Sequence, residues 1–248
     1  MDTIYILWLR QIIKYFRSKS RIIGSLAQPL LFLAAFGFGF GGIYQKAGEG
    51  NYIQFLVPGI ICMSVLFQAI FSGVDIIWDR QFGFLKETLV APVSRLEIIL
   101  GKVLGGATVA SIQGLIIFLI TFILGFRPIN IYSIPLAIFF MFLISILFAS
   151  MGTIIASLMD DMQGFQLIMN FLILPIMFLS GAFFPLAGLP KVIELLTKID
   201  PLTYGVDAMR GVLIGVTKFG VTTDLIILVA ISSILLFIGA KLFNRLQA

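Results

Sequence analysis

Charged residues divide the 248-residue chain into uncharged stretches whose lengths suit membrane-spanning helices. A helix needs about 20 consecutive apolar residues to cross the hydrocarbon core of a bilayer. The pattern predicts six spans, at residues 22–43, 54–78, 103–125, 135–158, 165–184 and 224–243. Because the number of spans is even, we expect both termini on the same side of the membrane.

Composition supports the same fold class. Hydrophobic residues make up 60% of the chain and charged residues only 12%, whereas a soluble domain carries about 25% charged residues. The mean hydropathy is +1.10. We therefore expect an all-α polytopic membrane protein, a single transmembrane domain over residues 1–248, embedded in a lipid bilayer.

Basic residues predict the orientation of this domain. With a cytoplasmic N-terminus, eleven Lys and Arg side chains lie in inner segments and six in outer segments. Cytoplasmic loops of membrane proteins carry the excess of basic residues, so we expect both termini in the cytoplasm. The formal charge of +5 follows from this bias and does not indicate a nucleic-acid partner.

Residues 1–20 predict an amphipathic helix. One face is apolar and the nearly opposite face is cationic; the two sets are Ile4, Leu7, Trp8, Ile12, Tyr15 and Phe16, and Arg10, Lys14, Arg17 and Arg21. A helix of this kind lies in the membrane interface, with its cations towards anionic lipid. The pattern leaves open whether the helix only anchors the chain or also has a mechanical role.

The predicted cytoplasmic loop, 79–101, contains a second short amphipathic helix. Apolar side chains share one of its faces, at Phe82, Leu85 and Leu89. Pro92 ends this helix, and Ser94 with Glu97 forms a capping-box pattern that opens the helix of the third span. The apolar face favours a docking element that fits a groove of a partner, although a solvated loop of this length is the alternative.

Segment 185–218 has apolar runs too short to span a membrane and too apolar for an exposed loop. Asp200 followed by Pro201 is typical of a helix start, with Asp as N-cap and Pro at the first helical position. Non-spanning backbone at membrane depth requires protein or a water-filled cavity around it. We therefore predict two short re-entrant helices on the outer side, where they could close a pore.

Polar residues within the predicted spans are few, and such residues are candidates for function. Gln68 and Asn170 are the candidates for a transport pathway, while a helix–helix hydrogen bond is the alternative role of Asn170 with Gln166, one turn away. Three pairs of glycines with small-xxx-small spacing suit close helix contact: Gly37 and Gly41, Gly101 and Gly105, Gly211 and Gly215.

The residue types also exclude several kinds of chemistry. The chain has no histidine and one cysteine, Cys62. Disulfides within the chain, thiolate metal clusters and histidine relays are therefore excluded. We expect no catalytic residue, no metal site and no cofactor held by this chain.

Three segments resemble the type-2 ATP-binding-cassette exporter permeases of bacteria and archaea. They are FGFLKETLVAPVSR at 82–95, SGAFFPLAGLP at 180–190 and PLTYGVDAMR at 201–210. The resemblance follows the chain in order over nearly its whole length. It implies a transmembrane subunit in the plasma (inner) membrane that works as a homodimer. The same resemblance implies two copies of a nucleotide-binding ATPase as partners.

The resemblance also implies roles for individual residues. The residues that would couple to the ATPase are Phe82, Gly83, Phe84, Leu85, Lys86, Glu87, Leu89 and Pro92. Those that would form an extracellular gate are Ser180, Gly181, Phe183, Phe184, Pro185, Pro190, Pro201, Tyr204 and Arg210. The N-terminal helix would be the interface helix beside the coupling helix.

The chain has no phosphate-binding loop of the G-x-x-x-x-G-K-[ST] type. We therefore expect ATP and Mg²⁺ to be bound by the partner ATPase, and this chain to be a transport subunit rather than an enzyme. The apolar spans favour a hydrophobic or amphipathic substrate, whether drug-like, lipid, glycolipid or polysaccharide. The alternatives are a secondary transporter driven by an ion gradient and a membrane-embedded enzyme or scaffold.

Overall fold

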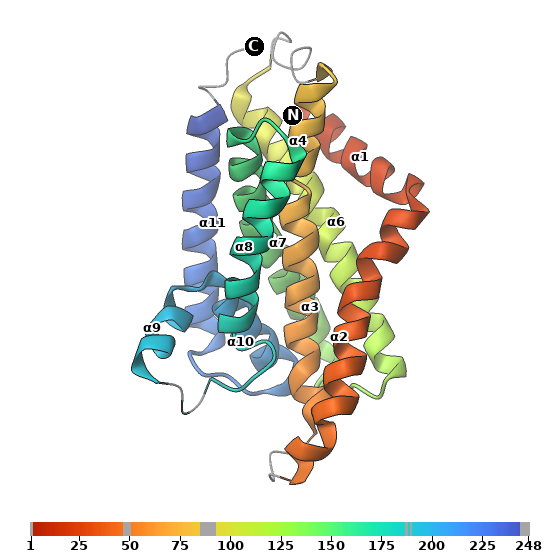
Figure 1. The fold of residues 1–248 in the computed structure, drawn as a ribbon, viewed down its shortest axis with the longest axis vertical. Helices are drawn as coiled ribbons and strands as arrows, with labels where there is room; N and C mark the ends of the chain where they lie inside the picture. Colours follow the sequence, from red (N-terminus) through yellow and green to blue (C-terminus); the bar gives the residue numbers. More distant parts are fainter. Residues whose placement is uncertain (1, 47–50, 85–92, 187, 189, 244–248) are drawn as a thin grey trace.

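The computed structural model describes residues 2–46, 51–84, 93–186, 188 and 190–243. Over these residues the chain is a bundle of helices without a strand (Figure 1). The helices are α1 (Asp2–Arg17), α2 (Lys19–Lys46), α3 (Tyr52–Phe71), α4 (Val74–Gln81), α6 (Arg95–Ile123), the short 3₁₀ helix η1 (Ile131–Ser133), α7 (Ile134–Leu158), α8 (Met162–Leu179), α9 (Lys191–Ile199), α10 (Pro201–Ile214) and α11 (Val221–Phe243).

Six helical segments of the described chain are long and apolar enough to cross a membrane. They are Lys19–Gly39, Tyr52–Gln81, Arg95–Ile123, Ile131–Leu158, Met162–Leu179 and Val221–Leu242. The predicted all-α, six-span fold class is confirmed. Below, the end of the bundle where α1 lies and α11 finishes is called the α1 end, and the other the α10 end (top and bottom of Figure 1).

The second predicted span, 54–78, lies within the helical segment Tyr52–Gln81, which is interrupted at Ser72–Gly73 between α3 and α4. The cause is a close approach to α7. A Cβ built on Gly73 would overlap the backbone of Gly152, and one built on Gly152 would overlap the backbone of Ile70. Only glycine permits backbones to come this near. The break therefore occurs where α3 touches α7 most closely.

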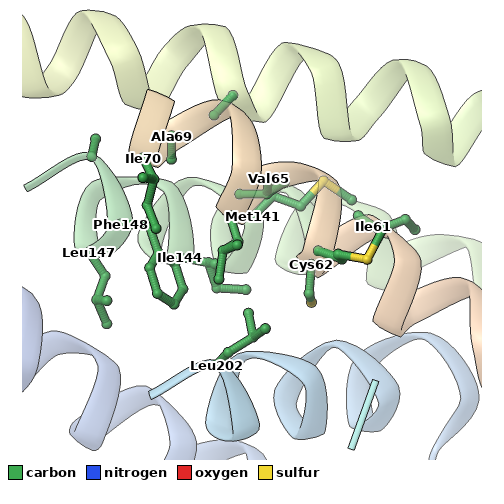
Figure 2. Close-up of a cluster of buried hydrophobic side chains, with 14 of the residues drawn as sticks. Ile61, Cys62, Val65, Ala69, Ile70, Met141, Ile144, Leu147, Phe148 and Leu202 are labelled. Atoms are coloured by element: carbon green, nitrogen blue, oxygen red, sulfur yellow. The ribbon is translucent and has the colours of Figure 1, made fainter. Parts of the chain in front are cut away.

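Helix α3 lies at the centre of the bundle, and nearly all of its side chains from Leu56 to Ile70 are buried. Figure 2 shows the core cluster that it forms with α7 and α10: Ile61, Cys62, Val65, Ala69, Ile70, Met141, Ile144, Leu147, Phe148 and Leu202. The outer helices α2 and α8 bury only 17% and 22% of their spanning windows. Their remaining surface is therefore available to lipid or to another protein.

Helix α1 lies obliquely across the bundle and packs along α6 (Figure 1). It packs against Gly101 and Gly105 of α6. A Cβ on Gly101 would lie 2.8 Å from Leu7 Cβ, and a Cβ on Gly105 would lie 2.7 Å from Gln11 Cγ. The indole Nε1 of Trp8 also donates to Thr108 Oγ1 at 2.9 Å. The small-xxx-small pair of α6 thus holds the amphipathic helix of the same chain.

The two short helices near the C-terminal span differ from each other. Asp200 caps α10 through Leu202 N, and Pro201 is its first residue, which confirms the predicted start signal. Most of α10 is buried, whereas α9 buries only Thr197 and exposes apolar side chains on its outer side. Gly215 ends α10 in a left-handed conformation at φ 71°, and a Cβ on Gly211 would lie 2.7 Å from Val221 Cγ2 of α11.

Candidate functional site

An ion-pair network connects three helices at the α1 end. It consists of Arg10 and Lys14 of α1, Asp75 and Asp79 of α4, and Lys102 of α6. Asp79 accepts from Lys102 Nζ at 2.5 Å and from Arg10 at 2.8 Å, and Lys14 pairs with Asp75. Arg10 and Lys14 lie one turn apart, as do Asp75 and Asp79, so the two helices present matched pairs of charges.

Burial makes this network important for stability. Asp75, Asp79 and Lys102 are almost fully buried, while Arg10 keeps 42% of its side chain exposed. A buried charge that loses its partner is strongly unfavourable. The network therefore holds α4 against both α1 and α6.

Arg80 attaches the end of α4 to the end of α7. Its guanidinium donates to the carbonyl oxygens of Ser157 and Met159 at 2.8 and 2.9 Å, and to Asp160 at 2.8 Å. Arginine suits this site because its donors are fixed in a planar fork. Side chains thus attach α4 on one side to α1 and α6 and on the other side to the end of α7.

The start of the predicted coupling element projects from this attached helix. Phe82 is 74% exposed, Gly83 adopts a left-handed conformation at φ 81°, and Phe84 is half exposed beneath the Arg10 guanidinium, 5.4 Å from its ring centre. The other predicted coupling residues, Leu85, Lys86, Glu87, Leu89 and Pro92, lie outside the described residues. The capping box of Ser94 with Glu97 at the start of α6 is confirmed.

A cleft of about 580 Å³ opens in the half of the bundle nearer the α1 end. It lies between α2, α3, α6 and α8, and its polar lining includes Arg21, Gln28, Gln68, Gln113, Gln166 and Asn170. Both predicted pathway residues, Gln68 and Asn170, therefore line one cavity. Asn170 and Gln166 form no side-chain hydrogen bond with another described residue, so the structure offers no helix–helix bond for them.

Gln113 forms the innermost polar part of this cleft and is only 1% exposed. Its Nε2 donates to the carbonyl of Ser25 at 3.1 Å and lies 3.5 Å from Ser64 Oγ. Its Oε1 is buried and has no hydrogen-bond partner among the described residues. Leaving such an acceptor unpaired costs about 1–3 kcal/mol, so a ligand donor that reached Gln113 Oε1 would be stabilised there.

The predicted gate residues gather at the α10 end. Ser180 caps α8 and accepts from Ala182 N at 3.2 Å. The Phe183 ring is buried against rings of α2, including Phe36 at a centroid distance of 4.9 Å, and its carbonyl accepts from Tyr52 Oη at 2.9 Å. Phe184 lies beside it, partly exposed. The turn after α8 thus packs across α2 and α3.

Arg210 of α10 binds the turn at residues 180–184 through hydrogen bonds to its backbone. Its Nη2 donates to the carbonyl oxygens of Gly181 at 2.8 Å and Ala182 at 3.2 Å, and its Nε to that of Phe55 at 3.3 Å. The guanidinium also lies 3.7 Å from the centre of the Phe55 ring. Both Gly181, at φ 75°, and the closely approached Gly59 give the turn room that a side chain would fill.

Hydrogen bonds to the backbone also order the rest of this end. Tyr204 Oη donates to the Lys198 carbonyl at 2.7 Å, and the Asp207 carboxylate accepts from the backbone N–H groups of Lys218 and Phe219 at 2.8 Å each. Burial raises the pKa of Asp200 to about 7, although hydrogen bonds from Leu202 N and Thr203 Oγ1 favour its ionised form.

The three gate prolines take different places. Pro201 begins α10, Pro190 immediately precedes α9, and Pro185 lines a crevice of about 550 Å³ together with Gln54 and Arg127. The structure therefore gathers Ser180, Gly181 and Phe183 in one turn, and Arg210 binds this turn through the Gly181 carbonyl. Pro190 belongs to the peripheral α9 side of the segment.

Sequence reasoning missed several residues of these sites. Lys102 closes the ion-pair network, Gln113 forms the innermost part of the cleft, and Tyr52 and Asp207 hold the α10 end. Lys102 and Asp207 had a usable signal, because a charged residue at the edge of an apolar stretch needs a partner. Nothing in the sequence identifies which partner it has.

Comparison with known proteins agrees with this architecture. The chain matches the family described as ABC-2 type transporter over residues 2–214. A putative transport permease, ycf38, of Cyanophora paradoxa is 31% identical over 217 residues, which cover 85% of this chain and 73% of the relative. Nodulation protein J of Rhizobium leguminosarum bv. trifolii is 29% identical over 213 residues, covering 84% of this chain and 80% of the relative. A match over most of its length shows that the chain belongs to the ABC-2 type transporter family.

Proposed function

We propose that this chain is the membrane subunit of an ATP-driven exporter, with its α1 end in the cytoplasm of a bacterium or archaeon. Two copies of the chain form the transport path, and two copies of a separate ATPase bind ATP and Mg²⁺. Family membership supports a transport permease. The bias of basic residues supports the orientation.

One observation carries the ATP-driven part of this proposal. The coupling segment begins on α4, which is continuous with the buried α3 and is bonded by its charges to α1, α6 and α7. A partner that displaces the exposed Phe82 displaces all four helices, because α4 cannot move alone without exposing unpaired buried charges. This gives a distant ATPase a physical route to the helices that line the cleft.

The cleft and the α10 end supply the remaining parts of a transport path. The cleft lies between α2, α3, α6 and α8 in the half of the bundle nearer the α1 end, so a hydrophobic or amphipathic substrate reaches it from the inner leaflet or the cytoplasm. The turn 180–184, fixed by Arg210 and Tyr52, closes the path at the outer side. Opening of the path then requires movement of α2 or α8 relative to this turn.

The test is reconstitution with a separately encoded ATPase that co-purifies with this chain. Phe82→Asp, Leu85→Asp and Glu87→Ala are expected to weaken co-purification and to abolish most ATP-dependent transport. Tyr132→Asp is the matched control, since Tyr132 is an equally exposed aromatic residue at the α10 end. Transport that persists after ATP depletion, or that is equally reduced by the control, contradicts the proposal and favours an ion-gradient-driven transporter.

A further inference from the structure

The cleft between α2, α3, α6 and α8 has a lining that selects among substrate classes. Five of its side chains are carboxamides, which come from all four helices. The cleft has one charged side chain, Arg21, and no carboxylate among the described residues that line it. A site for cationic drugs would need carboxylates or an open aromatic cage to stabilise the cation.

The carboxamides are available for a ligand. Among the residues that the structure describes, Gln28, Gln68, Gln166 and Asn170 form no side-chain hydrogen bonds, and the buried Gln113 Oε1 has no hydrogen-bond partner. Each carboxamide offers two N–H donors and one acceptor oxygen. Hydroxyl and amide groups match this combination because they both donate and accept, whereas an alkyl or halogenated aromatic molecule leaves these groups unpaired.

Arg21 adds a second element of selectivity. Arg21 lines the cleft at the side nearer the α1 end, close to Tyr15. It forms no ion pair with any residue that the structure describes. A guanidinium in this position suits a phosphate or carboxylate, which it binds through two parallel hydrogen bonds. The position is about two turns of α2 from Gln28, so the anion and the polar groups would belong to one molecule.

The apolar part of the ligand has a place as well. Leu174 and Ile173 of α8 and Phe67 and Phe71 of α3 border the same cleft. The volume of about 580 Å³ lies within the usual range for one small ligand, about 300–1,000 Å³. Because the outward surfaces of α2 and α8 are largely unburied, an alkyl chain can remain in the bilayer while the head group occupies the cleft.

We propose that the substrate is an anionic amphiphile whose head group carries several hydroxyl or amide groups, with the head group bound in this cleft. Arg21 binds the anion, and Gln113, Asn170 and their neighbouring amides bind the hydroxyl or amide groups. The proposal rests on the proposed transport function and narrows its substrate.

The test measures binding to the permease alone, which needs no ATPase, so its failure is distinct from a failure of ATP-driven transport. Native mass spectrometry of the full chain in a non-glycosidic detergent counts the lipids retained from four probes with identical acyl chains. The probes are phosphatidylinositol, phosphatidic acid, a neutral glucosyl diacylglycerol and phosphatidylcholine. Phosphatidylinositol is expected to be retained most, because only it combines the anion with a polyol.

Variants separate the contribution of Arg21 to lipid binding from that of the carboxamides. Asn170→Leu and Gln113→Leu are expected to lower retention of phosphatidylinositol about tenfold, the free energy of roughly one hydrogen bond, with little change for phosphatidic acid. Arg21→Gln is expected to lower both. Gln163→Leu is the matched control, because Gln163 lies on α8 outside the cleft lining.

Asn170 is exposed on α8, so Asn170→Leu remains informative if Gln113→Leu fails to fold. The proposal is overturned if phosphatidic acid and phosphatidylinositol are retained equally by the wild type. It is also overturned if Gln163→Leu has the same effect as Asn170→Leu, which would indicate general adhesion of lipid. Preferential retention of a lipophilic cation such as tetraphenylphosphonium would likewise contradict it.

Discussion

The two ends of this bundle hold buried charges in different ways. At the α1 end, Asp79 is satisfied by the side chains of Lys102 and Arg10, which come from two other helices. At the α10 end, Arg210 and Asp207 are satisfied by backbone groups: three carbonyl oxygens for Arg210 and two N–H groups for Asp207. The ion-pair network of the α1 end therefore joins side chains of separate helices, whereas Arg210 and Asp207 at the α10 end form bonds that fix the path of the backbone.

This difference suits different mechanical roles. Ion pairs between flexible side chains can follow small shifts of α1, α4 and α6 without being lost, because Lys and Arg have several rotatable bonds. Hydrogen bonds to the backbone of residues 181 and 182 allow no such adjustment, since carbonyl positions are set by the turn itself. We expect the α1 end to move as a connected unit and the α10 end to remain fixed until α10 itself is displaced.

The largest expected effect comes from breaking the network at Asp79, the buried acid that pairs with both Lys102 and Arg10. Asp79→Asn leaves the buried Lys102 without an ionised partner and is expected to destabilise the protein by about 3–5 kcal/mol. Cys62 is fully buried and is the only cysteine in the sequence, so the reaction of a thiol-specific dye during heating measures unfolding.

Two further variants check the cause of that effect. Asp160→Asn also removes an ion-pair carboxylate, but Asp160 is 94% exposed and its loss is expected to cost less than about 1 kcal/mol. The double variant Asp79→Asn/Lys102→Met should recover most of the stability, since no buried charge is then left unpaired. Equal losses from Asp79→Asn and Asp160→Asn would show that burial does not control the α1 end.

The next largest loss of stability is expected from changing Arg210, the buried charge that is bound to backbone carbonyls at the α10 end. Arg210→Met removes the donors for the Gly181, Ala182 and Phe55 carbonyls and is expected to cost about 2 kcal/mol. Arg210→Lys should recover only part of this, because an ammonium cannot reproduce the planar fork. The same dye assay serves as the measurement.

Arg127→Met is the matched control for Arg210. Arg127 also donates to two backbone carbonyls, those of Phe122 and Phe126, but its side chain is exposed. Water replaces its donors, so a loss well below that of Arg210→Met is expected. If the two variants were equally destabilised, the special role given to buried backbone bonds at the α10 end would be wrong.

A smaller effect is expected from pH at the start of α10. The pKa of Asp200 is about 7 in the folded protein and close to 4 in an unfolded chain. Between these values the folded state retains a proton that the unfolded state has lost, so stability falls as pH rises from about 4 to about 7. Asp200→Asn keeps the N-cap acceptor and should remove this part of the pH dependence, as followed by circular dichroism melting.

The smallest change in stability is expected from salt. Its effect on one variant at each end distinguishes the two ends directly. Lys14 is partly exposed, so its attraction to Asp75 is screened between 0.1 and 1 M NaCl. The destabilisation caused by Lys14→Met is expected to shrink by about 0.5 kcal/mol over this range. The destabilisation caused by Arg210→Met should stay constant, because its bonds are buried. A salt response shared by both variants would remove the distinction.

Local signals in the sequence predicted the parts of the fold that depend on neighbouring residues. The capping box of Ser94 and Glu97 and the start of α10 at Asp200 and Pro201 are both confirmed, because each needs only residues within one helical turn. The break at Ser72–Gly73 was missed, since it results from contact with Gly152 of a distant helix. Hydropathy cannot report such a contact, as the stretch on either side is uniformly apolar.

Among the candidate site residues, Gln68 and Asn170 were singled out as polar residues within apolar spans, and the structure places both in the lining of one cleft. Their neighbours Gln113 and Arg21 were not included, because the cleft is formed by four helices and each contributes only a few positions. The glycine pair Gly101 and Gly105 could be recognised by spacing. Its partner, helix α1 of the same chain, could not.

The sequence by itself determined that this protein is a membrane bundle of six apolar helices with an amphipathic N-terminal helix, because hydropathy, charge and capping act over short distances along the chain. Which charges are paired could be seen only in the tertiary structure. The same holds for the packing of α1 against Gly101 and Gly105 of α6, and for the five carboxamides that line one cleft. These features depend on the rotation and spacing of helices around one another. In an apolar medium many packings bury similar area, so specific polar and glycine contacts select among them.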